Sequence, residues 1–216
     1  MARYLITQSL LSAWLYQYDC AEGQEEAARE SFLKALRREP MEQTDAMLRG
    51  ISFEDAVQAT LKGDGGRSAW SHAERWSKRG GREAEYKCVM EMAERMRGGA
   101  YQLTEYKQKT IAGLDFLLMA KCDWVKAGVI YDCKRVEKYS DVGKYYESAQ
   151  HPMYLEVLPS AREFIYEICD DEDIYEERYT RADIPQSAED MIFQFVKSLS
   201  SEGLLDLYKE KWQSKH

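Results

Sequence analysis

The sequence of 216 residues contains no apolar run long enough to cross a bilayer. Its most apolar stretch, residues 111–120, includes the charged residue Asp115. The first residues also lack the apolar block of about 7–15 residues that a secretory signal requires. These two absences exclude a membrane-spanning protein and favour a cytoplasmic location.

Cysteine pairs with metal-binding spacing are also missing. The five cysteines are odd in number, and no two of them form a C-x-x-C motif. A disulfide framework and a structural zinc site are therefore poorly supported. The P-loop motif G-x-x-x-x-G-K-[ST] does not occur either, so any ATP-driven partner would be another chain.

An excess of positive charge is absent as well, because the formal net charge is -8. This excludes a histone-like polycation. The charge is unevenly distributed: residues 62–109 carry 11 basic and 7 acidic side chains, whereas residues 147–190 carry 3 basic and 13 acidic ones. Two solvated faces of opposite sign would explain this, and so would a basic surface that binds a polyanion.

Hydrophobic periodicity predicts a helical first half followed by a sheet. Helices are expected over 7–18, 25–38, 52–61, 69–78 and 82–97, strands over 101–111, 115–125, 129–134, 162–169 and 174–180, and further helices over 148–158, 185–200 and 204–212. This order predicts an α+β (mixed α/β) fold with a small central mixed sheet flanked by helices. We expect one domain, 1–216, in which 1–100 is mainly helical, 101–180 forms the catalytic sheet, and 182–216, from Ala182, is a helical tail.

Two acidic residues flank a predicted hairpin. If residues 127–128 form a two-residue turn, Trp124 pairs with Tyr131 and Asp123 lies opposite Asp132. The β-carbons of such a pair are roughly 4.5–5.5 Å apart, and like charges at that spacing repel each other. A divalent cation would relieve the repulsion. The alternative is a surface hairpin with ordinary alternating charges.

Lys134 completes a possible catalytic group. It shares a face with Asp132, because side chains two residues apart on a strand point the same way. Oxygen ligands suit Mg²⁺ or Mn²⁺, and a neighbouring lysine can orient water or support a developing anion. Cys122 and Cys133 alternate away from this face and are expected in the core. The pattern is typical of metal-assisted phosphodiester hydrolysis.

The D…D-x-K pattern of Asp123 and Asp132-Cys133-Lys134 resembles the core of the PD-(D/E)XK nuclease superfamily, in its RecB-like and phage-type exonuclease branch. Residues 50–54 match the upstream G-x-x-x-E element of that branch, and residues 150–154 match its Q-x-x-x-Y element. The opening at 6–14 resembles the helix that begins many members. The resemblance implies a restriction-endonuclease-like core.

The resemblance also implies an activity and its residues. It implies a Mg²⁺- or Mn²⁺-dependent DNA exonuclease of phage or prophage recombination or DNA repair. Glu54, Asp123, Asp132 and the carbonyl of Cys133 would bind metal, Lys134 would act on the attacking water, and Gln150 and Tyr154 would orient the DNA backbone or Lys134.

Basic side chains outside this core are candidates for contacting phosphates of linear double-stranded DNA. They are Lys121, Arg75, Lys78, Arg79 and Arg82. Neutralising the last four should weaken DNA binding and flatten its salt dependence. A homo-oligomer or a recombination partner protein is possible. Three alternatives stay open: an endonuclease on the same core, a non-catalytic DNA-binding or assembly protein, and an unrelated α+β protein.

Overall fold

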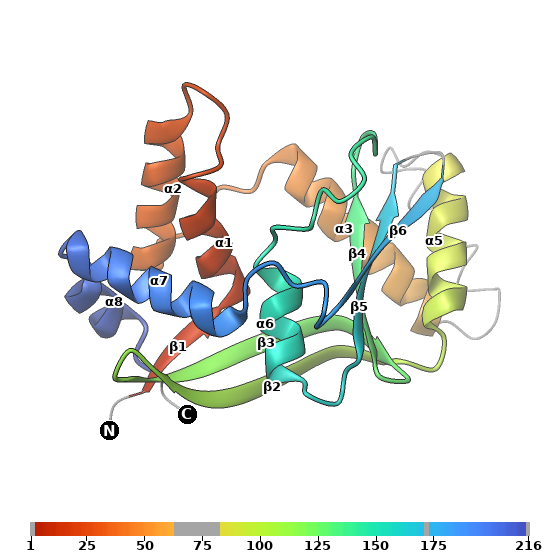
Figure 1. Cartoon of the computed structure of the whole chain (residues 1–216). Helices are drawn as coiled ribbons and strands as arrows, with labels where there is room; N and C mark the ends of the chain where they lie inside the picture. Colours follow the sequence, from red (N-terminus) through yellow and green to blue (C-terminus); the bar gives the residue numbers. More distant parts are fainter. Residues whose placement is uncertain (1–2, 63–82, 171–172, 215–216) are drawn as a thin grey trace.

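The structure, a computed structural model, describes residues 3–62, 83–170 and 173–214 (Figure 1). Its mixed α/β architecture confirms the predicted fold class. The strands are β1 (Arg3–Thr7), β2 (Ala100–Ile111), β3 (Leu114–Lys126), β4 (Val129–Arg135), β5 (Glu163–Cys169) and β6 (Ile174–Thr180); the helices are α1 (Gln8–Tyr16), α2 (Glu25–Arg37), α3 (Asp45–Lys62), α5 (Glu83–Met96), α6 (Gln150–Val157), α7 (Ala188–Ser201) and α8 (Leu205–Lys211). None of the described helices is long and apolar enough to cross a bilayer.

All six strands form one mixed sheet. Its connected order is β1-β3-β4-β5-β6, and β2 also pairs with β3. β1 runs parallel to β3 and β4 runs parallel to β5, whereas the other pairs are antiparallel. The sequence patterns missed β1, which is only five residues long and leads directly into a helix. Thr7 ends this strand and caps α1, since its hydroxyl accepts a hydrogen bond from the backbone N–H of Leu10.

One edge of β3 is only partly paired with neighbouring strands, and the unpaired segment is where side chains from other elements can approach. β2 pairs with one edge of β3 over residues 114–125. β1 and β4 therefore share the other edge, β1 beside residues 115–119 and β4 beside residues 124–126. Residues 120–123 of β3 have no neighbouring strand on that edge among the described segments. Their backbone groups need other partners, because buried N–H and C=O groups are almost always hydrogen-bonded.

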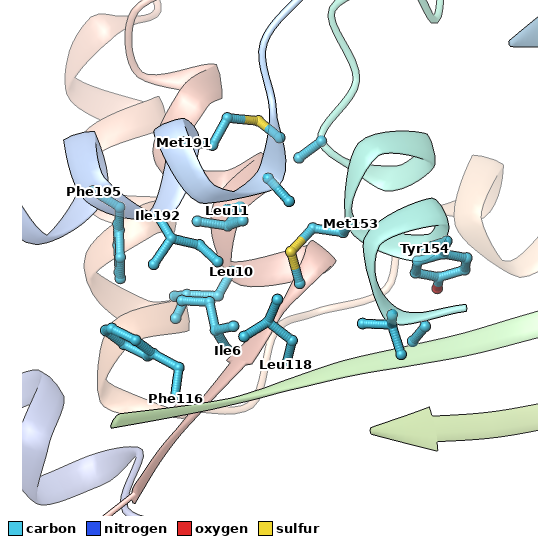
Figure 2. Packing of buried hydrophobic residues seen from close by; sticks show 14 of the residues in the cluster. Ile6, Leu10, Leu11, Phe116, Leu118, Met153, Tyr154, Met191, Ile192 and Phe195 are labelled. Atoms are coloured by element: carbon cyan, nitrogen blue, oxygen red, sulfur yellow. The ribbon is translucent and has the colours of Figure 1, made fainter. Parts of the chain in front are cut away.

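The larger hydrophobic core joins the two ends of the chain. Helices α1, α2, α7 and α8 gather at one end of the molecule, and α6 lies over β3 (Figure 1). The C-terminal tail belongs to this core: Tyr208 donates to the carbonyl of Leu5, and Trp212 donates to the carbonyl of Leu36. Figure 2 shows the centre of the cluster, where side chains of β1, α1, β3, α6 and α7 converge; those it labels are Ile6, Leu10, Leu11, Phe116, Leu118, Met153, Tyr154, Met191, Ile192 and Phe195.

A second cluster packs α3 and α5 against the other end of the sheet (Figure 1). Trp124 is buried at its centre, together with Phe53 and Val57 of α3 and Met92 and Met96 of α5. These contacts bring α3 beside β4. As a result, Glu54, which follows Phe53, lies in the region of Asp123 and Asp132.

Most predicted elements are present, but the start of α3 was predicted wrongly. This helix begins at Asp45 and not at Ser52, because Thr44 accepts a hydrogen bond from the N–H of Met47 through its hydroxyl. Ser52, where the sequence predicted the helix to begin, therefore lies inside α3. The helix expected at 69–78 lies outside the described residues.

Two glycines give opposite predictions for stability. A Cβ added at Gly99 would lie 3.1 Å from the carbonyl oxygens of Met96 and Val125, whereas one added at Gly50, inside α3, would meet nothing within 4 Å. We expect Gly99→Ala to lower the free energy of unfolding by about 1–3 kcal/mol through overpacking. Gly50→Ala should raise it by roughly 0.5–1 kcal/mol, because alanine restricts the unfolded chain. Urea unfolding measures the free energy of unfolding of both variants, and a change of the same sign and size in both would contradict the prediction.

Candidate active site

Three predicted residues meet at the junction of β4 and α6. The carboxylate of Asp132 is buried, with 3 % of the residue exposed. Its Oδ2 lies 2.5 Å from the ammonium nitrogen of Lys134, and its Oδ1 accepts a hydrogen bond from the amide nitrogen of Gln150. Gln150 also accepts from Lys134 at 3.3 Å through Oε1. Each of the three groups is thus held by the other two, and the predicted shared face of Asp132 and Lys134 is confirmed.

Asp123 reaches this group from β3, but not as a regular ladder partner. The predicted register is confirmed up to Trp124 opposite Tyr131, where the β3–β4 pairing ends. Beyond that point Asp123 Oδ2 accepts a hydrogen bond from the backbone N–H of Cys133 at 3.3 Å. The β2–β3 ladder is also interrupted here, at Gln102, whose φ is 48°. The regular pairing of β3 with β4 therefore ends before the aspartates, and a side chain of β3 bonds the backbone of β4 instead.

Helix α6 fills the unpaired edge of β3. The hydroxyl of Tyr154 donates to the carbonyl of Lys121 at 2.8 Å and so satisfies a backbone acceptor in the gap. Gln150 and Tyr154 share one helix face, as their spacing predicts. Pro152 falls in the first turn, where its missing N–H costs nothing. The helix begins at Gln150, two residues later than the predicted start at 148, and the hydroxyl of Ser148 accepts from the N–H of Gln150.

Burial and mutual repulsion disfavour the ionised form of the acidic groups at the site. Burial, and then repulsion by Asp132 and Glu54, raises the pKa of Asp123 to about 9. Burial also raises the pKa of Glu54, and Asp132 adds to this rise. Burial lowers the pKa of Lys134, but attraction to Asp132 outweighs it and leaves that pKa above its ordinary value. Keeping all three acidic groups ionised would therefore require more positive charge than Lys134 supplies.

The chemistry of these residues fits a hard divalent cation. Mg²⁺ and Mn²⁺ prefer oxygen ligands such as carboxylates and backbone carbonyls. The only partner of Asp132 Oδ2 among the described residues is the Lys134 ammonium. Within those residues no three His, Cys, Asp or Glu side chains lie close enough to form a ready metal-binding group. Glu54 is thus within electrostatic reach of the aspartates but does not close a cluster with them.

The other predicted residues have varied positions. The side chain of Lys121 is exposed, and its backbone carbonyl is what contacts the site. The side chain of Cys122 is buried in the larger cluster, whereas the thiol of Cys133 contacts Met96 Sδ at 3.8 Å in the second. The basic residues proposed to bind phosphates, Arg75, Lys78, Arg79 and Arg82, lie outside the described residues.

An aromatic layer lies beside the site, and sequence patterns gave no sign of its members Tyr166 and Tyr179. Tyr166 of β5 is the register partner of Asp132, and its ring lies 5.9 Å from the ammonium of Lys134. Tyr145 stacks on Tyr166 with 4.5 Å between ring centroids. His151 contacts the hydroxyl of Tyr166 and stacks on Tyr179. Only the strand register, which brings β5 beside β4, could have revealed these contacts.

His151 makes stability depend on pH. It is fully buried, and burial lowers its pKa from 6.5 to about 4. The unfolded chain therefore binds more protons than the folded chain between these values, so stability is present above about pH 6.5 and is lost as the pH falls towards 4. We expect a loss of about 2 kcal/mol between roughly pH 6.5 and 5. His151→Phe should flatten this dependence in urea unfolding, and an unchanged slope would contradict it.

The comparisons with known proteins show the fold. No protein-family model matches the chain, and a search of curated proteins finds no match. The chain is similar to the crystal structure of SSO0001, with a TM-score of 0.52 and 11% identity over 93% of this chain and 77% of that one. At lower TM-scores the chain matches the crystal structure of LHK-Exo in complex with dAMP, with a TM-score of 0.40 and 15% identity over 95% of this chain and 92% of that one. It also matches the crystal structure of Scheffersomyces stipitis Rai1, with a TM-score of 0.39 and 16% identity over 93% of this chain and 62% of that one. The chain therefore shares a fold with SSO0001.

Proposed function

We propose that this protein is a divalent-metal-dependent deoxyribonuclease of the PD-(D/E)XK type, acting as an exonuclease on linear double-stranded DNA. The observation that carries the proposal is the contact of Asp132, Lys134 and Gln150 beside Asp123. These are the residues that the D…D-x-K and Q-x-x-x-Y patterns single out. The preference for DNA ends rests on the resemblance to the exonuclease branch.

Each residue has a definable task in phosphodiester hydrolysis. Asp123, Asp132, Glu54 and the carbonyl of Cys133 would hold the Mg²⁺ or Mn²⁺. When bound, the cation supplies charge neutralisation and lowers the pKa of coordinated water. Lys134 would orient the attacking water and stabilise negative charge that develops on the phosphate.

Two residues of α6 would keep this group in place. Gln150 donates to Asp132 and accepts from Lys134, so it fixes the distance between them. Tyr154 holds β3 through the carbonyl of Lys121, two residues before Asp123. Such rigid support is what a catalytic group requires, because small displacements of reacting groups cost large factors in rate.

The test is digestion of linear and circular duplexes of one sequence, with Mg²⁺, with Mn²⁺ and with EDTA. The proposal expects release of nucleotides from the linear DNA, no cutting of the circle, and no reaction with EDTA. Cutting of the circle would instead identify an endonuclease on the same core. Binding of DNA without cutting in either metal would favour a non-catalytic DNA-binding or assembly protein.

A further inference from the structure

A second buried carboxylate lies two strands away from Asp132. The register pairs Asp132 with Tyr166, and Tyr166 with Glu177. These three residues therefore form one row across β4, β5 and β6, and side chains in such a row point to the same face of the sheet. Glu177 is only 5 % exposed. A carboxylate buried on an outer strand needs a specific reason to be there.

Glu177 ties down the loop between β4 and α6. It accepts hydrogen bonds from the backbone N–H groups of Gly143 (3.2 Å) and Tyr145 (3.1 Å) and from the hydroxyls of Tyr139 and Tyr179. A carboxylate offers about four acceptor sites, so its capacity is used in full. Burial raises its pKa, but hydrogen bonds that include those from Tyr139, Tyr179 and the backbone N–H of Tyr145 outweigh burial and lower the pKa, so Glu177 stays ionised at neutral pH.

The tethered loop places Tyr145 at the candidate active site. Its ring stacks on Tyr166 at 4.5 Å with 19° between the planes. The ammonium of Lys134 lies 5.9 Å from the centroid of the Tyr166 ring, so Tyr145 and Lys134 both lie against Tyr166, and the two groups interact electrostatically. Burial raises the pKa of Tyr145, and the positive charge of Lys134 opposes the rise. Tyr145 is half-buried, which leaves part of it open to a ligand.

We propose that Tyr145 is a further active-site residue, whose hydroxyl donates a hydrogen bond to the phosphate bound beside Lys134, and that Glu177 is the residue that positions it. This inference rests on the proposed nuclease function. A phenol here adds a neutral donor for phosphate oxygens at a site that is short of positive charge. The sheet supports it through an unbroken set of contacts from Glu177 to Tyr145 to Tyr166.

The test is a double-mutant cycle of Tyr145→Phe and Glu177→Gln, measured on linear duplex DNA with Mn²⁺. Tyr145→Phe keeps the ring and removes the donor, and its kcat/KM should fall on the order of 10²-fold. The kcat/KM of Glu177→Gln should fall by a similar factor, because the amide cannot accept hydrogen bonds from all four donors. The double variant should be no slower than the slower single variant, since both changes remove one contact.

Stability and rate measured together distinguish the positioning of Tyr145 from a purely structural role of Glu177, and the proposal expects the following. Glu177→Gln should lower the Tm equally in the wild-type and Tyr145→Phe backgrounds, whereas its effect on rate should appear only in the background that keeps Tyr145. Tyr146→Phe, the neighbouring and 45 % exposed tyrosine, serves as the matched control and should keep the wild-type rate. Wild-type kcat/KM in Tyr145→Phe, or rate losses that multiply in the double variant, would overturn the proposal.

A second measurement needs no nuclease activity. Hydrogen exchange of the Gly143 and Tyr145 amides should be about ten-fold faster or more in Glu177→Gln, because both lose their acceptor. Unchanged exchange would refute the anchor even in an active enzyme. If wild-type protein cuts no DNA, the proposed function fails, and Kd for linear DNA replaces kcat/KM in the cycle. A Kd unaffected by Tyr145→Phe would then overturn the phosphate contact.

Discussion

Replacing Lys134 by methionine should reduce DNA cleavage by a factor on the order of 10²–10⁴ with Mg²⁺ or Mn²⁺ present. Methionine has similar length and no charge. The variant loses the group that would orient water, and it loses the partner that lies 2.5 Å from Asp132 Oδ2. Initial rates of nucleotide release from linear duplex DNA measure the effect.

Loss of folding must be separated from loss of chemistry in that experiment. Of its partners among the described residues, the buried Asp132 carboxylate keeps only Gln150 in the variant, so the free energy of unfolding should fall by about 1–3 kcal/mol. Lys134→Arg restores charge and much of this stability, but its planar guanidinium cannot take the geometry of an ammonium and should leave the rate low. Lys138→Met, an exposed lysine in the following loop, is the matched control. Wild-type cleavage by Lys134→Met would refute the mechanism.

The hairpin was predictable because local chemistry determines it. Ala127 and Gly128 both have positive φ, 49° and 76°, as a two-residue hairpin turn requires. The length of that turn sets the register of β3 against β4 and therefore the shared face of Asp132 and Lys134. The spacing of Gln150 and Tyr154 likewise gives one helix face. These inferences needed only neighbours in sequence.

The rest of the site depends on contacts between distant segments. The separation of the strands at Asp123 accompanies the positive φ of Gln102, a residue type that gives no sign of such backbone. Glu177 is far from Tyr145 in sequence, and its role follows only once β6 lies beside β5. A glutamate in an acidic segment is usually solvated, so its burial could not be read from composition.

Replacing Asp123 by asparagine should raise stability without metal and remove activity. The carboxylate is disfavoured by burial and by repulsion from Asp132 and Glu54, and these effects raise its pKa to about 9. Asparagine keeps an oxygen that can accept from the N–H of Cys133, but it carries no charge. We expect a gain of about 1 kcal/mol, which corresponds to a Tm rise of roughly 2–4 °C in a chain of this size. Cleavage should fall on the order of 10³-fold.

Divalent ions should reverse the order of the two proteins. A cation present at about 100 times its Kd raises the free energy of unfolding by about 2.7 kcal/mol. Mn²⁺ should therefore raise the Tm of the wild type above that of Asp123→Asn. Asp115→Asn is the matched control, because Asp115 lies on the same strand and bonds to Thr110 instead. It should respond to Mn²⁺ as the wild type does. An equal Mn²⁺ response in Asp123→Asn would mean that Asp123 binds no metal, and its buried carboxyl group would then destabilise the folded protein without contributing to catalysis.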